Sequence, residues 1–236
     1  MQEASYDEAI SISLGSSYMK VISYSLYGSA PMYCAGTIRN AEQVKEKYPG
    51  WKCLVWHDDS VPEDTLKKLA SFDHVILKNM TGSGIPGMYW RFLCLNVTEI
   101  EVFCVRDSDS RITDREVEAV NDWLQKNKTL HLMRDHPHHN YPVMGGMWGF
   151  RNDRSRWDII SRLQSWLSNQ RATFTKMDDM DFIASIYHDY FNDCIVHDDW
   201  KRCQNSIDFP SKREPKTFVG AIHDENEVAT DHWRYL

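Results

Sequence analysis

The sequence predicts a single α/β domain with a mainly parallel central sheet flanked by helices. In the first half of the chain, four short runs rich in β-branched and aromatic residues alternate with helical patterns. This alternation is typical of parallel strands that are joined by crossover helices. The chain has 236 residues, of which 42% are hydrophobic, and this is enough to bury one full core.

The first half supplies four strands and three helices. The expected strands are residues 20–26, 51–57, 73–78 and 101–106, and the expected helices are residues 34–48, 62–69 and 88–97. Proline is tolerated in the first turn of a helix, so Pro62 fits the start of the second one. The glycine-rich segment MTGSGIPGM should be a flexible connection ahead of the third helix.

The second half is less regular. Thr113 and Glu116 have the spacing of a capping box, which predicts a helix through Leu124. The other expected elements are strands over residues 130–134, 143–150, 193–197 and 217–222, and amphipathic helices over residues 153–168 and 179–190. No repeat or long linker occurs, so a single domain is the simplest organisation, with a polar N-terminal extension over residues 1–19.

Composition and charge argue against several classes of protein. The formal net charge of −7 repels a phosphate backbone, so we expect no nucleic-acid binding. No stretch of about 20 apolar residues and no secretory signal is present, which predicts a soluble cytoplasmic protein without a transmembrane segment, in the host cytoplasm if the source is viral. The six cysteines show no CxxC spacing, and we expect buried free thiols in a reducing compartment.

Two carboxylates, Asp107 and Asp109, directly follow the apolar run 101–106. Residues two apart point to the same side of an extended chain, so both can converge just past the end of a strand, where ligands bind in open α/β sheets. A hard divalent cation such as Mn²⁺ or Mg²⁺ would relieve their repulsion. The alternative is a solvated turn or helix cap, and the position after a buried strand favours the metal site.

Two further polar segments follow predicted strands. Residues 57–59, His-Asp-Asp, could touch a ligand from the neighbouring strand, although a polar turn is the favoured interpretation. Asp135 and His136 could contact hydroxyl or phosphate groups of a substrate, and a surface loop has equal weight. Zinc is disfavoured in this segment because Pro137 interrupts it and no cysteine lies nearby.

The run GGMWG contains Gly145, Gly146 and Trp148. Glycines inside a strand-like run mark a bulge or a close approach of the backbone to another group. Trp148 could stack on the face of a sugar. The alternative is a tight strand turn with the indole in the core.

Several charged groups in the C-terminal third are ambiguous on local evidence. Asp179 and Asp181 lie at a predicted helix start, where acidic residues interact favourably with the helix dipole. His197 ends a predicted strand and could be an extra metal ligand, although a structural role is more common. Lys212 and Arg213 could neutralise a diphosphate, or form a solvated basic pair.

Several motifs, in order along nearly the whole chain, resemble those of a known family. They are SYSLYG (23–28), YWRFL (89–93), RDSDSR (106–111) with Arg115-Glu116, MRDHPHHN (133–140), GGMWG (145–149), DMDF (179–182) and FVG (218–220). On these residues the chain resembles the GT-A-fold, DxD-containing glycosyltransferases encoded by chlorella viruses, together with related bacterial proteins. It departs from the bacterial proteins at Met180, where they have glutamine, and at His223, where they lack histidine.

The resemblance implies a GT-A (nucleotide-diphospho-sugar transferase) fold. Its nucleotide-sugar-binding half would be residues 20–112, and its acceptor-binding half would be residues 113–236. It also implies Mn²⁺ or Mg²⁺ bridging the DxD and the donor diphosphate. Asp109 would be the principal metal ligand, and Asp107 would contact the metal or the ribose.

The resemblance further implies roles for individual residues. Ser25, Leu26 and Tyr27 would line the nucleobase pocket, Arg91 would lie under the nucleotide and brace the DxD, and Ser108 would contact the donor. The residues that would face the donor sugar or the acceptor are His136, Gly145, Gly146 and Trp148, and those that would lie near the reacting anomeric carbon are Asp179 or Asp181.

We therefore expect a metal-dependent glycosyltransferase, hexosyltransferase-like, that moves a sugar from a nucleotide-sugar donor to a glycan, glycoprotein or other hydroxyl acceptor, with UDP as the nucleotide by analogy. The metal and Lys212 would neutralise the leaving diphosphate, and Asp179 or Asp181 would be the general base if the reaction inverts. In a retaining reaction the leaving phosphate can take the proton. The alternatives are a metal-dependent nucleotidyltransferase or phosphodiesterase, and a non-catalytic carbohydrate-binding module.

Overall fold

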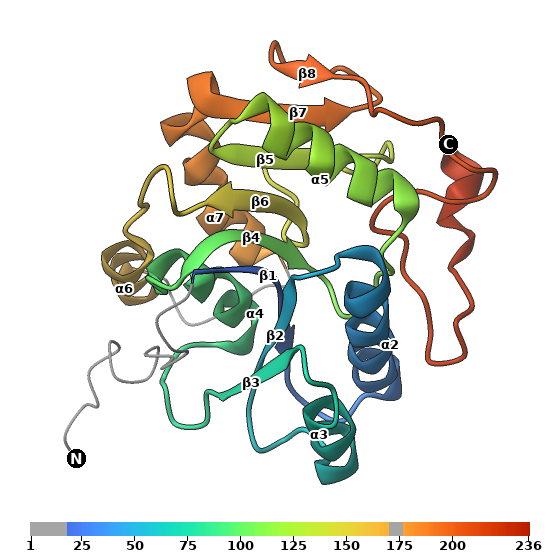
Figure 1. The fold of residues 1–236 in the computed structure, drawn as a ribbon. Coiled ribbons are helices and arrows are strands. Elements are labelled where there is room, and N and C mark those ends of the chain that lie inside the picture. Colours follow the sequence, from blue (N-terminus) through green and yellow to red (C-terminus); the bar gives the residue numbers. More distant parts are fainter. Residues whose placement is uncertain (1–17, 170–176) are drawn as a thin grey trace.

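The computed structural model describes residues 18–169 and 177–236, which form one α/β domain around an eight-stranded sheet (Figure 1). The strand order is β3-β2-β1-β4-β6-β5-β7-β8. The strands are β1 (Met19–Leu26), β2 (Lys52–His57), β3 (Val75–Asn79), β4 (Ile100–Arg106), β5 (Leu130–Arg134), β6 (Met147–Arg151), β7 (Cys194–Asp198) and β8 (Ser206–Ile207). Strand β6 is antiparallel to β4 and β5, and the other neighbours are parallel, which confirms a mainly parallel sheet.

Helices cover both faces of this sheet (Figure 1). They are α2 (Pro31–Lys47), α3 (Glu63–Ala70), α4 (Gly87–Trp90), α5 (Asp114–Lys126), α6 (Ile159–Asn169) and α7 (Asp178–Asp189), with 3-10 helices at Arg91–Asn96, Phe191–Asp193 and Asp231–Tyr235. Helices α2, α3 and α5 share a core with Ile22 and Val55, and α4, α6 and α7 share the other core with Val21 and Leu54. Successive strand residues point to opposite faces, so the apolar runs of β1 and β2 supply both cores.

The start of α5 is held by one local hydrogen bond and by contacts with residues distant in sequence. Thr113 Oγ1 accepts a hydrogen bond from the backbone N–H of Glu116 at 3.2 Å. The Glu116 carboxylate does not complete the capping box, because it accepts from Arg106 Nε at 2.7 Å and from the Tyr48 hydroxyl at 3.2 Å. The predicted helix start is confirmed, and Glu116 ties α5 to the end of β4.

Some predicted elements differ from the structure. Residues 217–222 form no strand, because Gly220 has a φ of +85°, a left-handed conformation that interrupts extended backbone. The last strand is instead β8, which pairs with β7 and was not predicted. Strand β6 begins only at Met147, and the predicted helix over 88–97 is α4 followed by a 3-10 helix.

Residues 1–17 and 170–176 lie outside the described part of the chain. Of the predicted N-terminal extension over 1–19, residues 1–17 lie outside the described part, and Met19 already begins β1. All six cysteines lie among the described residues and are free thiols, and five of them are buried. Among the described helices, none combines the length and the apolar character that crossing a membrane requires.

Candidate active site

A pocket of about 750 Å³ opens at the edge of the sheet where β1, β4 and β5 end. The turn before β6, the start of α7 and the C-terminal segment that begins at Phe218 complete its wall. These segments meet where ligands bind in open α/β sheets. The predicted site residues that line the pocket are Ser25, Leu26, Tyr27, Arg91, Asp107, Ser108, Asp109, His136, Gly145, Gly146 and Asp179.

Arg91 lies between two carboxylates of this pocket. Its Nη1 contacts Asp107, and its Nη2 donates to Asp179 Oδ2 at 2.8 Å. Its backbone is also held, because its N–H donates to Ser25 Oγ at 2.9 Å and its C=O accepts from Ser23 Oγ at 2.8 Å. Burial disfavours the charged guanidinium, but the two carboxylates outweigh this and raise the pKa of Arg91. Arg91 is therefore a fixed cation that links β1, the DxD and α7.

Asp179 is buried, with 6% of its surface exposed. Burial raises the pKa of Asp179 above its ordinary value; Arg91 opposes the shift and Asp107 adds to it. A buried carboxylate with a raised pKa, in a pocket, is suited to accepting a proton from a substrate.

Gly145 and Gly146 leave room for the network of Arg91, Asp107 and Asp179. A Cβ on Gly146 would lie 2.1 Å from Asp107 Oδ2 and 2.8 Å from its backbone N. A Cβ on Gly145 would lie 2.9 Å from Arg91 Nη2 and 3.0 Å from Asp179 Oδ2. A side chain at either position would displace the network, which confirms the predicted close approach of the backbone.

The DxD turn is attached to the end of β1. Ser108 is buried between the two aspartates, and its Oγ donates to the Ser25 C=O at 3.1 Å. Asp107 and Asp109 both line the pocket, and the Asp107 side chain is 41% exposed although Oδ1 contacts Arg91. Among residues 18–169 and 177–236, no group of three or more His, Cys, Asp and Glu side chains could hold a metal ion. A cation here would need further oxygen ligands from substrate and water.

The loop after β5 places two histidine rings with different surroundings in the pocket wall. His136 Nδ1 accepts from the His138 N–H at 3.1 Å, and its Nε2 donates to the His232 C=O at 2.9 Å. His139 Nδ1 accepts from the Asp135 N–H at 3.0 Å. Burial lowers the pKa of both rings, to about 3 for His139. Both rings are therefore neutral at pH 7, with the proton on Nε2.

Comparisons with known proteins agree with this fold. No protein family and no curated sequence matches the chain. Galactosyltransferase LgtC, solved in complex with donor and acceptor sugar analogues, is 12% identical, with a TM-score of 0.51 over 75% of this chain and 73% of that one. The chain has the GT-A fold.

Two other solved structures match less well than this. They are 4-diphosphocytidyl-2C-methyl-D-erythritol synthase from Anaerococcus prevotii (TM-score 0.47, 14% identity, 76% of this chain and 88% of that one) and S. aureus TarS (TM-score 0.48, 14% identity, 77% and 58%). At 12–14% identity these structures are similar to the chain in fold alone.

Asp135 lies beside the GT-A pocket but does not face it. It is fully buried, and its carboxylate pairs with Arg115 at 3.0 Å and with Arg213 at 2.7 Å. It also accepts from the Val219 N–H at 2.8 Å, and Asp199 pairs with the same two arginines. The predicted substrate contact of Asp135 is therefore wrong. This residue ties the C-terminal segment to the end of β5.

Trp148 belongs to the core of the GT-A domain and not to the pocket. Its side chain is fully buried, and its ring packs edge-on against Phe92 and Phe103, with centroids 5.6 and 5.5 Å apart. In β6 it pairs with Val105, and the alternation of the strand turns the indole toward the face covered by α4, α6 and α7. The predicted stacking of Trp148 on a sugar is wrong.

His197 is also enclosed by the fold. Its Nδ1 lies 2.8 Å from His131 Nε2, and its Nε2 lies 3.2 Å from Asp122 Oδ2. Its ring is fully buried against Phe209, and burial lowers the pKa of His197 to about 4. Both ring nitrogens are used within the fold, so the prediction of His197 as a metal ligand is wrong.

Asp181 and Lys212 are exposed and line neither described pocket. Residues two apart on a helix point in nearly opposite directions, so Asp179 faces the pocket and Asp181 faces solvent. At 212–213 it is Arg213 that turns inward, where it pairs with Asp199 at 2.6 Å. The structure thus does not bring Asp181 or Lys212 to the predicted donor site.

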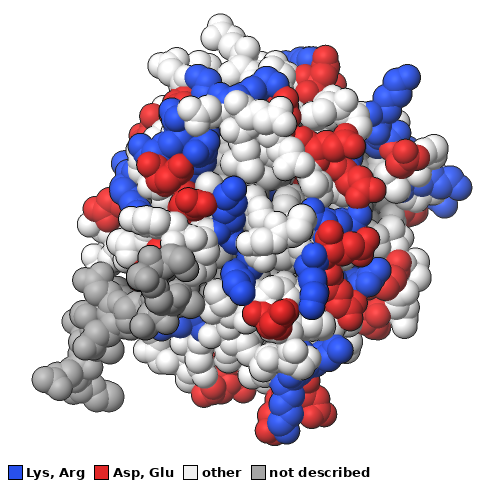
Figure 2. Space-filling model, viewed as in Figure 1, with Lys and Arg blue, Asp and Glu red and all other residues white. Residues whose placement is uncertain are grey.

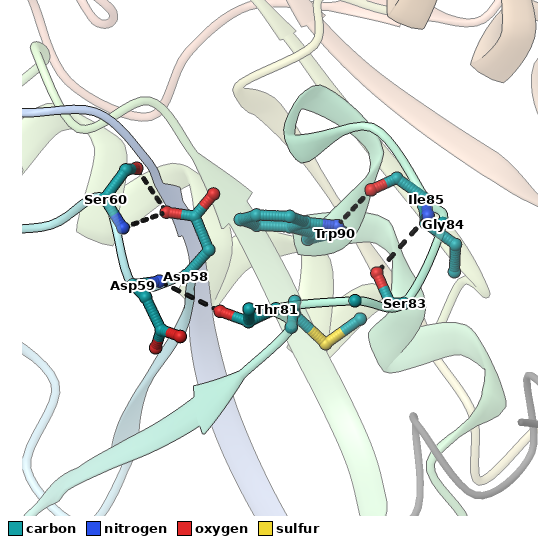
Figure 3. Close-up of a pocket in the computed structure, with 10 residues that line it drawn as sticks. Asp58, Asp59, Ser60, Thr81, Ser83, Gly84, Ile85 and Trp90 are labelled. Atoms are coloured by element: carbon teal, nitrogen blue, oxygen red, sulfur yellow. Dashed lines mark hydrogen bonds between the residues drawn. The ribbon is translucent and has the colours of Figure 1, made fainter.

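A second pocket of about 240 Å³ lies at the ends of β2 and β3 (Figure 3). The Trp90 ring borders it, facing the turn formed by Asp58, Asp59 and Ser60. Asp58 accepts from the Ser60 N–H at 3.1 Å, and the Asp59 N–H donates to Thr81 Oγ1 at 2.9 Å. These bonds confirm the polar turn that the sequence favours for residues 57–59.

Charges are distributed differently on the surface and in the main pocket. Figure 2 shows basic and acidic side chains interspersed over the face in view. Among the described residues that line the main pocket, by contrast, Asp107, Asp109 and Asp179 accompany a single arginine, Arg91. A ligand that carries or recruits positive charge, such as a metal-bound diphosphate, fits this imbalance.

Several lining residues could not be found from the sequence. Tyr33 comes from α2, His232 comes from the C-terminal 3-10 helix, and Phe218 comes from a loop. Five methionines also line the pocket; they are Met88, Met144, Met147, Met177 and Met180. None of these has a local pattern that separates a pocket residue from a core residue. His139 lies inside the motif MRDHPHHN, but only the hydrogen bonds of the loop separate its role from that of His136.

Proposed function

We propose that the protein is a metal-dependent glycosyltransferase that moves a sugar from a nucleoside diphosphate donor, UDP by analogy, to a hydroxyl group of a glycan or glycoprotein. The observation that supports it best is the network of Asp107, Arg91 and Asp179 beside Asp109, in a pocket at the ligand-binding edge of a GT-A sheet. The pocket volume of about 750 Å³ is in the usual range for small-molecule sites.

Asp107 and Asp109 would hold Mn²⁺ or Mg²⁺ in this proposal. Asp107 Oδ2 makes no hydrogen bond with any described residue, and its side chain is 41% exposed, so this oxygen can bind a hard cation. When bound, the cation would supply positive charge to the departing nucleoside diphosphate. Arg91 fixes Asp107 from its other oxygen, so the carboxylate is oriented before substrate binds.

Ser25, Leu26 and Tyr27 at the end of β1 would receive the nucleobase. The Tyr27 ring packs edge-on against Trp90 at 5.8 Å, and a Cβ on Gly87 would lie 2.3 Å from Tyr27 Cδ1. Tyr27 nevertheless keeps 47% of its surface exposed. An aromatic ring held in this way can stack on a planar base without losing further side-chain freedom.

Asp179 would act on the acceptor. If the reaction inverts the anomeric centre, Asp179 takes the proton of the attacking hydroxyl as the bond to C1 forms and the nucleoside diphosphate leaves, and its raised pKa suits that role. If the reaction retains the anomeric configuration, the leaving phosphate takes the proton of the acceptor hydroxyl, and Asp179 positions Arg91.

The test is calorimetric titration of UDP, GDP and CMP, with Mn²⁺ and with EDTA, into wild type, Asp109→Ala and Asp114→Ala. We expect Mn²⁺-dependent binding of one nucleotide, weakened at least about 100-fold by Asp109→Ala, because a direct ligand of the metal is removed. Asp114 is the matched control, since it is an exposed aspartate of α5 that pairs with Lys47 and lines neither described pocket.

Other outcomes would contradict the proposal. A folded protein that binds none of the three nucleotides has no donor site. Sugar binding that survives both EDTA and the loss of Asp109 would indicate a carbohydrate-binding module. Release of pyrophosphate from a nucleoside triphosphate and a sugar phosphate would indicate a nucleotidyltransferase.

A further inference from the structure

His139 is a nearly buried residue that contributes to the wall of the main pocket. Only 7% of its surface is exposed, and its ring packs near Phe218 and His136, with centroids 5.8 and 5.5 Å away. The side chain comes from the loop after β5, which Asp135 anchors through its pairs with Arg115 and Arg213. The ring is therefore held in place before any ligand binds.

The hydrogen bonds of this loop fix the tautomer of His139. Its Nδ1 accepts the Asp135 N–H at 3.0 Å, so the proton of the neutral ring is on Nε2. Nε2 makes no hydrogen bond with the described residues. A polar group that is almost buried, oriented and without a partner in a pocket wall is suited to bind a ligand.

His136 provides an internal comparison. It has the same tautomer, because its Nδ1 accepts the His138 N–H, but its Nε2 already donates to the His232 C=O at 2.9 Å. Of these two rings, only His139 therefore has a donor left for a ligand.

The surroundings decide which kind of oxygen this donor suits. Burial keeps the His139 ring neutral, and Asp107 is close enough to influence its pKa. A phosphate oxygen and a sugar hydroxyl can both accept this N–H, and the phosphate oxygens would already have a cation at the DxD as a partner. A sugar hydroxyl would have no such cation, and the pocket places His139 beside the Phe218 ring and on the same wall as the DxD, where the sugar next to the diphosphate would lie.

We propose that His139 is a specificity-determining residue whose Nε2–H donates a hydrogen bond to a hydroxyl group of the transferred sugar. This inference rests on the proposed function and adds to it a contact with the sugar part of the donor. The contact would discriminate between sugars by the position of one hydroxyl, because a sugar without it leaves this pocket N–H unpaired in the complex.

Two amide variants separate this contact from a structural role of the ring. In His139→Asn, the side-chain oxygen can replace Nδ1 as acceptor for the Asp135 N–H, but nothing reaches the position of Nε2. In His139→Gln, the amide NH₂ can reach the position of Nε2, but nothing replaces Nδ1. A structural role therefore favours the asparagine variant, and a ligand role favours the glutamine variant.

The measured quantity is the ratio of the Kd of a nucleotide sugar to the Kd of its nucleotide, with Mg²⁺. The probes are UDP with UDP-glucose, UDP-galactose and UDP-N-acetylglucosamine, and GDP with GDP-mannose. We expect His139→Asn to raise this ratio about three- to tenfold for at least one sugar, the effect of one neutral hydrogen bond. His139→Gln should leave the ratio near its wild-type value.

Other results overturn the inference and distinguish it from the proposed function. If His139→Asn leaves the Kd ratio unchanged for every sugar, His139 makes no contact with the sugar. If His139→Gln changes the Kd ratio more than His139→Asn does, the ring serves only to hold the loop. If His139→Asn binds the nucleotide without its sugar more weakly than wild type does, the Nε2–H of His139 contacts the diphosphate and not the sugar. If wild type binds no nucleotide at all, the proposed function fails. A loss confined to the sugar ratio leaves that function intact.

Nitrogen-15 NMR of the histidine rings gives a readout that does not depend on turnover. In the ligand-free protein, the His139 signals should show an unprotonated Nδ1 and a protonated Nε2. Addition of the nucleotide sugar with Mg²⁺ should shift the Nε2–H signal of His139, and His136 serves as the control because its Nε2 already has a partner. A proton on Nδ1 of His139 would overturn the inference.

Discussion

Two networks of arginine and aspartate lie near the same edge of the sheet and differ in what they leave open. In the pocket network, Arg91 bridges Asp107 and Asp179, and Asp107 keeps 41% of its side chain exposed. In the buried network, Asp135 is fully enclosed and pairs with two arginines, one of which is Arg115. The residue types are the same, but a ligand can reach the carboxylate of Asp107 and cannot reach that of Asp135.

The difference lies in whether the carboxylate oxygens have protein partners. Both oxygens of Asp135 are occupied, since they accept from Arg115, from Arg213 and from the Val219 N–H. Asp107 has Arg91 on one oxygen, and the other has no hydrogen bond among the described residues. A saturated carboxylate stabilises the fold, whereas an unsaturated one is available for binding.

The largest effect should come from removing the saturated carboxylate. Asp135→Ala removes the fully buried partner of Arg115 and Arg213, which among the described residues then keep only the part-exposed Asp199 as a carboxylate partner. It also leaves the buried Val219 N–H unpaired, so we expect the free energy of unfolding to fall by about 3–5 kcal/mol. Asp107→Ala is the matched control, and it should cost about 1 kcal/mol, because Asp107 is part-exposed and Arg91 keeps Asp179. Urea unfolding of both variants measures these free energies. Equal losses of stability in the two variants would contradict the difference between the saturated and the unsaturated carboxylate.

The buried histidines His131 and His197 form a contact without charge, and this contact should make the stability of the fold depend on pH. Burial lowers the pKa of His131 well below its usual value and that of His197 to about 4. An unfolded histidine titrates near 6.5, so below that pH the unfolded state binds more protons and stability falls as pH decreases toward 4.

For His197 alone, the expected loss between pH 6.5 and pH 5 is roughly 1.5 kcal/mol. The measurement is the free energy of unfolding at both pH values, in wild type and in His197→Gln, which keeps a neutral polar group at this site. Wild type should lose more stability than the variant over this interval. Parallel pH dependence in the two proteins would show that His197 is not held neutral by the fold.

The sheet could be predicted from the sequence because each strand of the first half carries its own apolar pattern. Strands β1, β2 and β4 match the predicted runs closely, and the DxD follows β4 as expected. The antiparallel pairing of β6, which lies in the predicted run 143–150, and the two-residue β8 could not be predicted in the same way. The pairing of β6 with β4 is a long-range choice, and β8 is too short to show a period.

The position of a side chain relative to the pocket could be predicted only where one local feature decides it. The position of Asp107 and Asp109 after a buried strand is such a feature. Trp148 and Lys212 were misassigned because the direction of each depends on partners distant in sequence. Trp148 faces the core through the register of β6, and Lys212 lies outward because its neighbour Arg213 takes the inward position.

The smallest expected effect tests the two uses of glycine within GGMWG. In Gly146→Ala, the new Cβ would meet Asp107 Oδ2 at 2.1 Å and the Asp107 backbone N at 2.8 Å, so the DxD must shift. We expect Mn²⁺-dependent nucleotide binding to weaken about tenfold. Loss of a group that only hydrogen-bonds to a metal ligand already lowers metal affinity by about this factor, and here the ligand itself is displaced. Isothermal titration of the folded variant measures this loss.

Gly149→Ala is the matched variant three residues away. Its Cβ would meet the Phe103 C=O at 2.9 Å and the Trp123 ring at 3.0 Å, both in the core and not in the pocket lining. Overpacking there should lower the free energy of unfolding by about 1 kcal/mol and leave nucleotide affinity unchanged. If Gly149→Ala weakened binding and Gly146→Ala did not, the DxD would not be the donor site, and the unsaturated end of the pocket network would need another ligand.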